Sequence, residues 1–267
     1  MKWEVSMIRR LLPAVVGLAV LAAVAPAHAQ GANNYRLMTG PQGGVWVPLG
    51  GALKNIWEKA IPGLSVQTLP GAGIANVRGV TDQLAEAGYI AIAPDFLSGS
   101  ATNGGGTAEL GSGDAVRKAI SGLKPEQITA DLNAVADYGA KLPASNGKVA
   151  VSGFCWGGTQ TFRHATNSKN IKAGFAFYGS GPEKEEDITR IACPVYGFYG
   201  GNDNRVNATI PKSTELMKKA GKTYEPVIYE GAGHGFMRAG EAPDASAVNK
   251  KAREEAWTRW KELLKKL

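Results

Sequence analysis

The segment GFCWGG, residues 153–158, places one cysteine among glycines directly after the apolar run Val149–Val151. A strand that ends in Gly-x-nucleophile-x-Gly turns sharply into a helix and lifts the central side chain, here Cys155, above the sheet. We expect Gly153 and Gly157 both to be required, because a Cβ atom at either position would collide with the neighbouring strand and helix. The pattern predicts a nucleophilic cysteine. The alternative is a small buried cysteine in a glycine-rich turn.

The helix that follows this turn would assist the chemistry of Cys155. Its N-terminus directs free N–H groups and a positive dipole end at the sulfur, which favours a thiolate over a thiol. The backbone N–H of Trp156, the first residue of that helix, would face the oxygen of a tetrahedral intermediate. It would supply half of an oxyanion hole.

A cysteine nucleophile also needs a base, and the base needs an orienting partner. His234 lies in GAGHGF, after a predicted strand at 224–229, and Asp203 lies in YGGNDNRV, just beyond a predicted strand at 195–200. Both follow the carboxyl ends of strands, where open α/β sheets bind ligands, and their order along the chain is that of α/β-hydrolases. His164 is a competing base, but it falls on the helix that leaves the turn and is expected to face solvent.

The elements that must position these residues alternate regularly from about residue 77. Alternation of strands with helices predicts right-handed crossovers and a mostly parallel sheet covered on both faces. The last helix places Trp257, Trp260 and Leu264 on one apolar stripe. Strands are predicted at 89–94, 148–152, 173–178, 195–200 and 224–229.

The N-terminus is typical of an exported protein. Three basic residues precede the uncharged apolar stretch 11–25, and Ala27 and Ala29 are small residues at both positions that specify cleavage. The stretch is too short to favour a membrane span, which leaves an uncleaved anchor as the alternative. We predict a signal peptide over 1–29, a mature chain that begins near Gln30, and a periplasmic or secreted location.

Composition excludes several other classes of function. Lysines are dispersed apart from those on the C-terminal helix, so the net charge of +7 predicts a solvated basic face rather than a nucleic-acid site. Cys155 and Cys193 lie in different local contexts, which predicts two free thiols. After processing only His164 and His234 remain, and that inventory builds no metal centre.

GFCWGG, GNDN and GAGHGF, together with LAEAGYIAIAPDFLSG, resemble the dienelactone hydrolases from about residue 77 to 267. That resemblance implies an α/β-hydrolase fold and hydrolysis of an ester or lactone, typically the enol lactone of a carboxymethylenebutenolide. It implies that Cys155 attacks the carbonyl, His234 transfers protons and Asp203 orients His234. Arg238 matches a family arginine that pairs with the substrate carboxylate, whereas the family's second arginine, after the APD segment, is not found.

The chain departs from this family upstream. Members carry a His-Glu-x-Phe/Tyr-Gly-like loop that supplies a second oxyanion N–H and a glutamate controlling cysteine ionisation, and no such motif lies between residues 30 and 77. Residues 33–76 instead resemble the start of TAXI-type TRAP transporter solute-binding proteins. Ser65–Leu69 leads through a loop into the next helix, so we hypothesise that it pairs beside the strand of the nucleophile. A backbone N–H near Gly71 or Ala72 would then be the second donor.

We therefore predict an α/β-hydrolase-like three-layer sandwich with a mostly parallel sheet and atypical N-terminal strands. Its parts are the signal peptide at 1–29, a segment at 30–76 resembling a solute-binding protein, and a hydrolase-like domain at 77–267. It is expected to be a monomer without cofactor or metal that acts on a small-molecule ester or lactone, with reduced activity. The alternatives are a fragment that binds a small carboxylate through the loop at 39–46 and an inactive hybrid.

Overall fold

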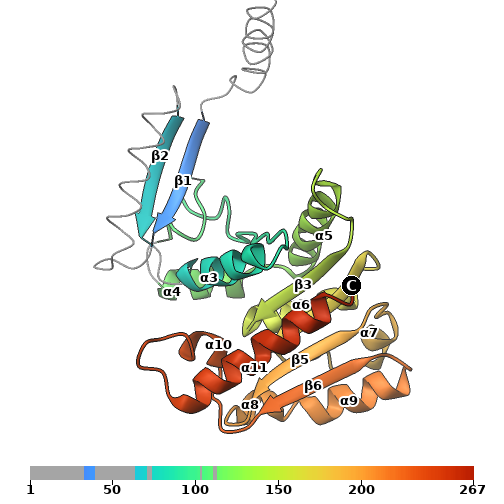
Figure 1. Ribbon diagram of the computed structural model, residues 1–267. Coiled ribbons are helices and arrows are strands. Elements are labelled where there is room, and N and C mark those ends of the chain that lie inside the picture. The colour runs from blue at the N-terminus through green and yellow to red at the C-terminus, as the bar shows by residue number, and fades with distance from the viewer. Residues whose placement is uncertain (1–32, 40–63, 71–73, 103, 111–112) are drawn as a thin grey trace, which may run out of the picture. The chain divides into compact units, whose positions relative to one another are not determined.

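The computed structural model describes residues 33–39, 64–70, 74–102, 104–110 and 113–267 (Figure 1). The chain divides into two compact units, Met1–Ala75 and Asn76–Leu267. The predicted signal peptide and the glycine loop that follows Thr39 lie outside the described residues, as do Gly71 and Ala72. No helix in the described part of the chain is long and apolar enough to cross a membrane.

The first unit contains a pair of parallel strands, β1 (Asn33–Thr39) and β2 (Leu64–Pro70). These form a two-stranded sheet of their own. The hydrogen-bonded partner that the structure gives β2 is β1, and the hypothesis that residues 65–69 also pair beside the strand of Cys155 stays a prediction. Parallel strands need a long crossover, and the connection over residues 40–63 is long enough to let β2 find its partner nearby in the chain.

The sheet of the second unit consists of four parallel strands in chain order. Each was predicted from the sequence to within a few residues, because apolar runs bounded by turn residues are typical of buried parallel strands. Within this sheet β3 is an edge strand. The four strands are β3 (Val149–Phe154), β4 (Ile171–Phe177), β5 (Val195–Gly200) and β6 (Tyr224–Tyr229).

Helices connect and cover these strands. α5 begins at a proline, which suits the first turn of a helix because its missing N–H would be unpaired there anyway. The helices are α3 (Ile74–Glu86), α4 (Gly113–Ser121), α5 (Pro125–Lys141), α6 (Trp156–Ala165), α7 (Glu185–Thr189), α8 (Asn204–Asn207), α9 (Ile210–Lys219), α10 (Phe236–Ala239) and α11 (Ala247–Leu264).

Two apolar clusters give the second unit its three layers. On one side Trp257 and Trp260 of α11 pack with aromatic residues of β4 and β5, and the axis of α11 runs roughly along β5 and β6 (Figure 1). On the other side Phe162 of α6 and Met217 of α9 pack with Val195 of β5. Burying one such aromatic side chain contributes about 1.5–3 kcal/mol, so these clusters hold the sheet between its helices.

The predicted strand at 89–94 is not a strand in the structure. Its two isoleucines, Ile90 and Ile92, are 49% and 40% exposed. Alternating β-branched residues favour an extended chain, but a strand also needs a neighbouring backbone to take up its hydrogen bonds. None of the described strands hydrogen-bonds to this segment.

Candidate active site

The turn between β3 and α6 holds Cys155 in a strained conformation. Its backbone has φ 55° and ψ −117°, a region that residues with a side chain rarely adopt. Two hydrogen bonds support it: the Cys155 N–H donates to the carbonyl of Phe177 at 3.0 Å, and the Cys155 carbonyl accepts from the N–H of Thr159 at 3.1 Å. The sharp strand-to-helix turn is the one that the sequence predicts.

The glycines around this turn are not equivalent. A Cβ atom on Gly153 would overlap the backbone carbonyl of Gly157, and one on Gly158 would lie 2.5 Å from the carbonyl oxygen of Phe177. A Cβ atom on Gly157 would meet nothing within 4 Å. The expectation that Gly157 is required is therefore wrong, because α6 turns that position away from its neighbours. Gly158 has the packing role instead.

The three residues predicted to cooperate lie in one chain of hydrogen bonds. His234 Nε2 is 3.1 Å from the Cys155 sulfur, and His234 Nδ1 is 2.5 Å from Asp203 Oδ2. Asp203 is buried, and its other oxygen caps α8 by accepting from the N–H of Val206 at 3.3 Å. His234 lies between β6 and α10, beside Gly235, whose φ of 77° turns the loop. The carboxylate of Asp203 thus holds the His234 imidazole so that Nε2 lies within hydrogen-bonding distance of the Cys155 thiol.

Burial favours the protonated thiol of Cys155. Burial around the sulfur raises the pKa of Cys155, and the negative charge of Asp203 raises it further. The positive charges of Arg238 and Arg205 lower it, but the net shift is upward. The residue still reaches solvent. The expectation that the N-terminus of α6 favours a thiolate is not met, because desolvation outweighs the nearby positive charges. His234 Nε2, 3.1 Å from the sulfur, is the group placed to accept the thiol proton.

The remaining site residues surround this thiol. Trp156 begins α6, so its N–H has no acceptor within the helix, and its ring packs edge-on against Phe96 at 5.8 Å. Arg238 is exposed on α10 and acts electrostatically on Cys155. Arg205, which the sequence analysis missed, does the same from α8. Its position two residues after Asp203 is the signal that could have found it.

His164 does not take part in this site. It is fully buried, where the sequence predicted exposure, because the last turn of α6 packs against α5. Its Nε2–H donates to Asn133 Oδ1 at 2.9 Å, while its Nδ1 has no partner. Burial and the nearby Arg163 lower the pKa of His164 to about 4.

Acid should therefore destabilise the protein through His164. The folded state keeps the imidazole neutral, whereas the unfolded chain binds a proton below its ordinary pKa of 6.5. This contribution is fully present above pH 6.5 and is lost as pH falls towards 4, by about 2 kcal/mol at pH 5. Urea unfolding at pH 7 and pH 5 measures it. His164→Gln, which is neutral throughout, should lack this component, and an equal loss in both proteins would contradict the assignment.

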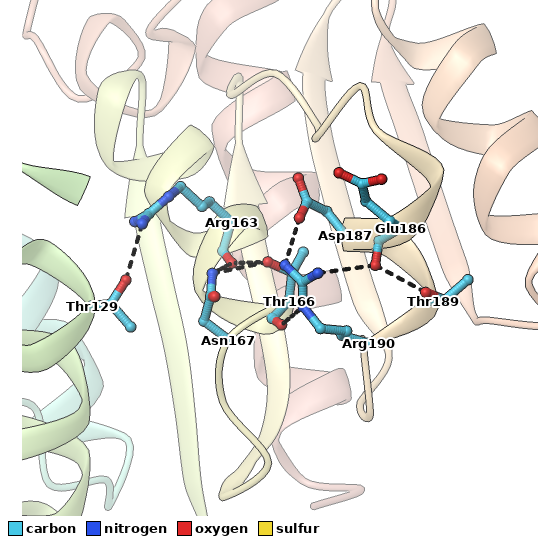
Figure 2. A network of polar contacts seen from close by, with 8 residues as sticks. All are labelled: Thr129, Arg163, Thr166, Asn167, Glu186, Asp187, Thr189 and Arg190. Carbon is cyan, nitrogen blue, oxygen red and sulfur yellow. Dashed lines mark hydrogen bonds and ion pairs between the residues drawn. The ribbon is translucent and has the colours of Figure 1, made fainter. Parts of the chain in front are cut away.

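A cavity of about 360 Å³ lies beside the end of α6, and Figure 2 shows the network of polar contacts in the same region. Arg190 donates there to the carbonyls of Thr166 and Glu186 and pairs with Asp187 at 2.5 Å. Arg163 donates to Thr129 at 3.0 Å. These hydrogen bonds and the ion pair tie α7 and α5 to α6. In the described part of the chain, acidic, histidine and cysteine side chains form no cluster that could hold a metal ion.

Comparison with known proteins places this arrangement in a family. The family profile described as "Dienelactone hydrolase family" matches residues 59–267, which include β2. The chain belongs to the dienelactone hydrolase family. The resemblance seen in the sequence motifs is thus confirmed for this family, and the match begins upstream of residue 77.

Two relatives of this dienelactone hydrolase family member carry the name "Putative carboxymethylenebutenolidase". The protein of Methylorubrum extorquens is 31% identical over 172 residues, which cover 60% of this chain and 58% of the relative. The protein of Escherichia coli K12 is 29% identical over 202 residues, which cover 71% of each. The match thus spans between about half and three quarters of these relatives.

Solved structures share the fold. The dienelactone hydrolase-like promiscuous phosphotriesterase P91 from metagenomic libraries aligns with a TM-score of 0.60 and 24% identity, covering 72% of this chain and 80% of P91. The structure titled m3DLH aligns with a TM-score of 0.59 and 20% identity, covering 90% of this chain and 89% of the other. The α/β-hydrolase fold predicted from the sequence is confirmed.

Proposed function

We propose that this protein hydrolyses ester or lactone bonds with a Cys155–His234–Asp203 triad. The observation that carries the proposal is the continuous pair of contacts from the thiol through the imidazole to a buried carboxylate. A nucleophile, a base within hydrogen-bond reach of it, and a third group that orients the base are the parts that acyl transfer through a covalent intermediate requires.

In the first half-reaction His234 Nε2 takes the thiol proton while the sulfur bonds to the carbonyl carbon. The carbonyl electron pair moves to oxygen, which the N–H of Trp156 stabilises. The tetrahedral intermediate then reforms the carbonyl and breaks the bond to the leaving oxygen, which takes the proton from the imidazolium. The product is a thioester on Cys155 and a free alcohol or enol. Asp203 stabilises the imidazolium throughout.

In the second half-reaction water replaces the alcohol. His234 takes a proton from the water as its oxygen attacks the thioester, and the collapse of the intermediate breaks the carbon–sulfur bond. The proton returns to sulfur, so Cys155 is again a thiol and a carboxylic acid is released. No cofactor enters this cycle.

The substrate class and the rate follow from neighbouring residues. Arg238 and the name of the relatives favour a small lactone or ester that bears a carboxylate. We propose a reduced rate, since Trp156 supplies the one oxyanion donor identified in the described residues and loss of a donor costs about 10²–10³-fold. The basic and apolar start of the sequence supports export to the periplasm or beyond, and we propose a monomer.

Trapping the covalent intermediate tests this function directly. The wild-type protein, mixed with p-nitrophenyl acetate and quenched in acid within seconds, should carry one acetyl group on the peptide that contains Cys155. Peptide mass spectrometry locates the group. Cys193, which is buried, is the internal control and should stay unmodified. Release of p-nitrophenol with no acetyl group on Cys155 would contradict the mechanism. If neither p-nitrophenol nor an acetyl group is found, the protein is an inactive hybrid.

A further inference from the structure

Tyr178 is held in an unfavourable backbone conformation next to the triad. Its φ is 39°, and Cys155 is the other non-glycine residue with positive φ in the described part of the chain. It directly follows β4, and its N–H donates to the carbonyl of Phe198 at 2.8 Å. A Cβ atom on the next residue, Gly179, would overlap the backbone of α6, so this turn packs closely on the helix of the nucleophile.

The side chain of Tyr178 is fixed between the core and the base. It is 3% exposed, and its ring lies 5.5 Å from that of Phe236, edge to face, and 6.2 Å from that of Phe154. The centroid of the Tyr178 ring is also 5.1 Å from that of the His234 imidazole, and the two ring planes make an angle of 58°. Strain of this kind persists only where the surroundings impose it, and it gathers at functional sites.

The imidazole of His234 needs such support. Its side chain is 35% exposed, so core packing encloses only part of the ring. Asp203 holds one nitrogen, and a single hydrogen bond leaves the ring able to tilt about that contact. A tilt would carry Nε2 away from the sulfur, and a misplacement of about 1 Å can cost about 100-fold in rate.

We propose that Tyr178 is a positioning residue for His234. The strained backbone of Tyr178 directs the tyrosine ring at the imidazole of His234, and this contact keeps His234 Nε2 beside the thiol of Cys155. This inference rests on the proposed function, because it assigns Tyr178 a part in readying the same nucleophile. The ring, rather than the hydroxyl, carries the effect, since the observed contact is between ring centroids.

The test compares Tyr178→Leu with Tyr178→Phe and with a matched core variant, Phe175→Leu. Phe175 is fully buried in the same apolar cluster, but its recorded ring contacts are with Tyr196, Phe198 and Trp260 and none is with the triad. Tyr178→Leu should lower kcat for p-nitrophenyl acetate about 10–100-fold per folded molecule with KM nearly unchanged. Tyr178→Phe should keep most of the activity.

A second readout does not require turnover. The rate of Cys155 alkylation by iodoacetamide, followed by peptide mass across pH 6–10, reports how readily the thiol loses its proton to His234. Asp203, Arg205 and Arg238 also act on this titration, and all three are unchanged in the variants. Tyr178→Leu should slow alkylation about tenfold at pH 7 and move the profile to higher pH, because an imidazole held off the sulfur takes its proton less readily.

The outcomes separate this inference from the proposed function. If wild-type protein hydrolyses no ester, the proposed function fails, while slower alkylation in Tyr178→Leu still supports the positioning role. Equal alkylation profiles in wild type and Tyr178→Leu overturn the positioning role of Tyr178. A loss of kcat in Phe175→Leu as large as that in Tyr178→Leu also overturns it. If Tyr178→Leu does not fold, Tyr178→Met, which fills more of the space, takes its place under the same criteria. Loss of activity in Tyr178→Phe equal to that in Tyr178→Leu would assign the role to the hydroxyl and also overturn the proposal.

Discussion

Cys155→Ala should lower the rate of p-nitrophenyl ester hydrolysis by at least about 10³-fold. The variant keeps His234, Asp203 and the N–H of Trp156, but it has no atom that can form the acyl intermediate. Loss of the nucleophile in such a triad costs nearly as much as loss of the whole triad. Initial rates at saturating and limiting substrate measure the loss in kcat and in kcat/KM.

The matched control for this variant is Cys193→Ala. Cys193 is buried in the cluster that contains Phe162 and Val195, and its contacts are apolar. Burial raises the pKa of its thiol to about 11, so it stays protonated and unreactive at neutral pH. Cys193→Ala should keep the wild-type rate. Residual hydrolysis in Cys155→Ala above one tenth of the wild-type rate would reject the cysteine mechanism.

Gly153→Ala should destabilise the protein by about 3 kcal/mol or more, out of a typical total of about 5–15 kcal/mol. The new Cβ would overlap the carbonyl of Gly157 and would lie 2.8 Å from Thr161 Oγ1. The overlapped atom is backbone in the first turn of α6, so it cannot rotate away as a side chain could. The turn would have to open, and Cys155 would move with it. Urea unfolding measures the loss of stability, and the acetyl-trapping assay reports the displacement.

Gly157→Ala is the matched control, four residues along the same turn. Its Cβ would meet nothing within 4 Å, and the position lies in the regular first turns of α6. Alanine favours a helix over glycine by up to about 1 kcal/mol, so stability should be unchanged or slightly higher. Equal destabilisation by the two substitutions would mean that the turn tolerates no side chain at either glycine. It would contradict the difference in packing between Gly153 and Gly157.

The sequence was sufficient for the features that short stretches encode. The turn at Cys155 follows from its flanking glycines and the apolar run before it, and Pro125 predicts the start of α5. The order of Cys155, Asp203 and His234, each after a strand, predicted which side chains would meet. Periodicity and turn chemistry are local properties, so they can be read without knowing what the chain packs against.

Tertiary structure decided what depends on partners distant in the chain. The sequence around Ile90 and Ile92 predicts a strand, yet this segment forms none, because a strand also needs a neighbouring backbone within hydrogen-bonding reach. The sequence predicted that His164 is exposed and that a Cβ atom at Gly157 would collide, but His164 is buried against α5 and a Cβ atom at Gly157 would meet open space. The contact of Tyr178 with the imidazole joins segments after two different strands, and no local pattern marks it. The sequence by itself determined which groups could do chemistry, and packing between separate segments decided which of them touch.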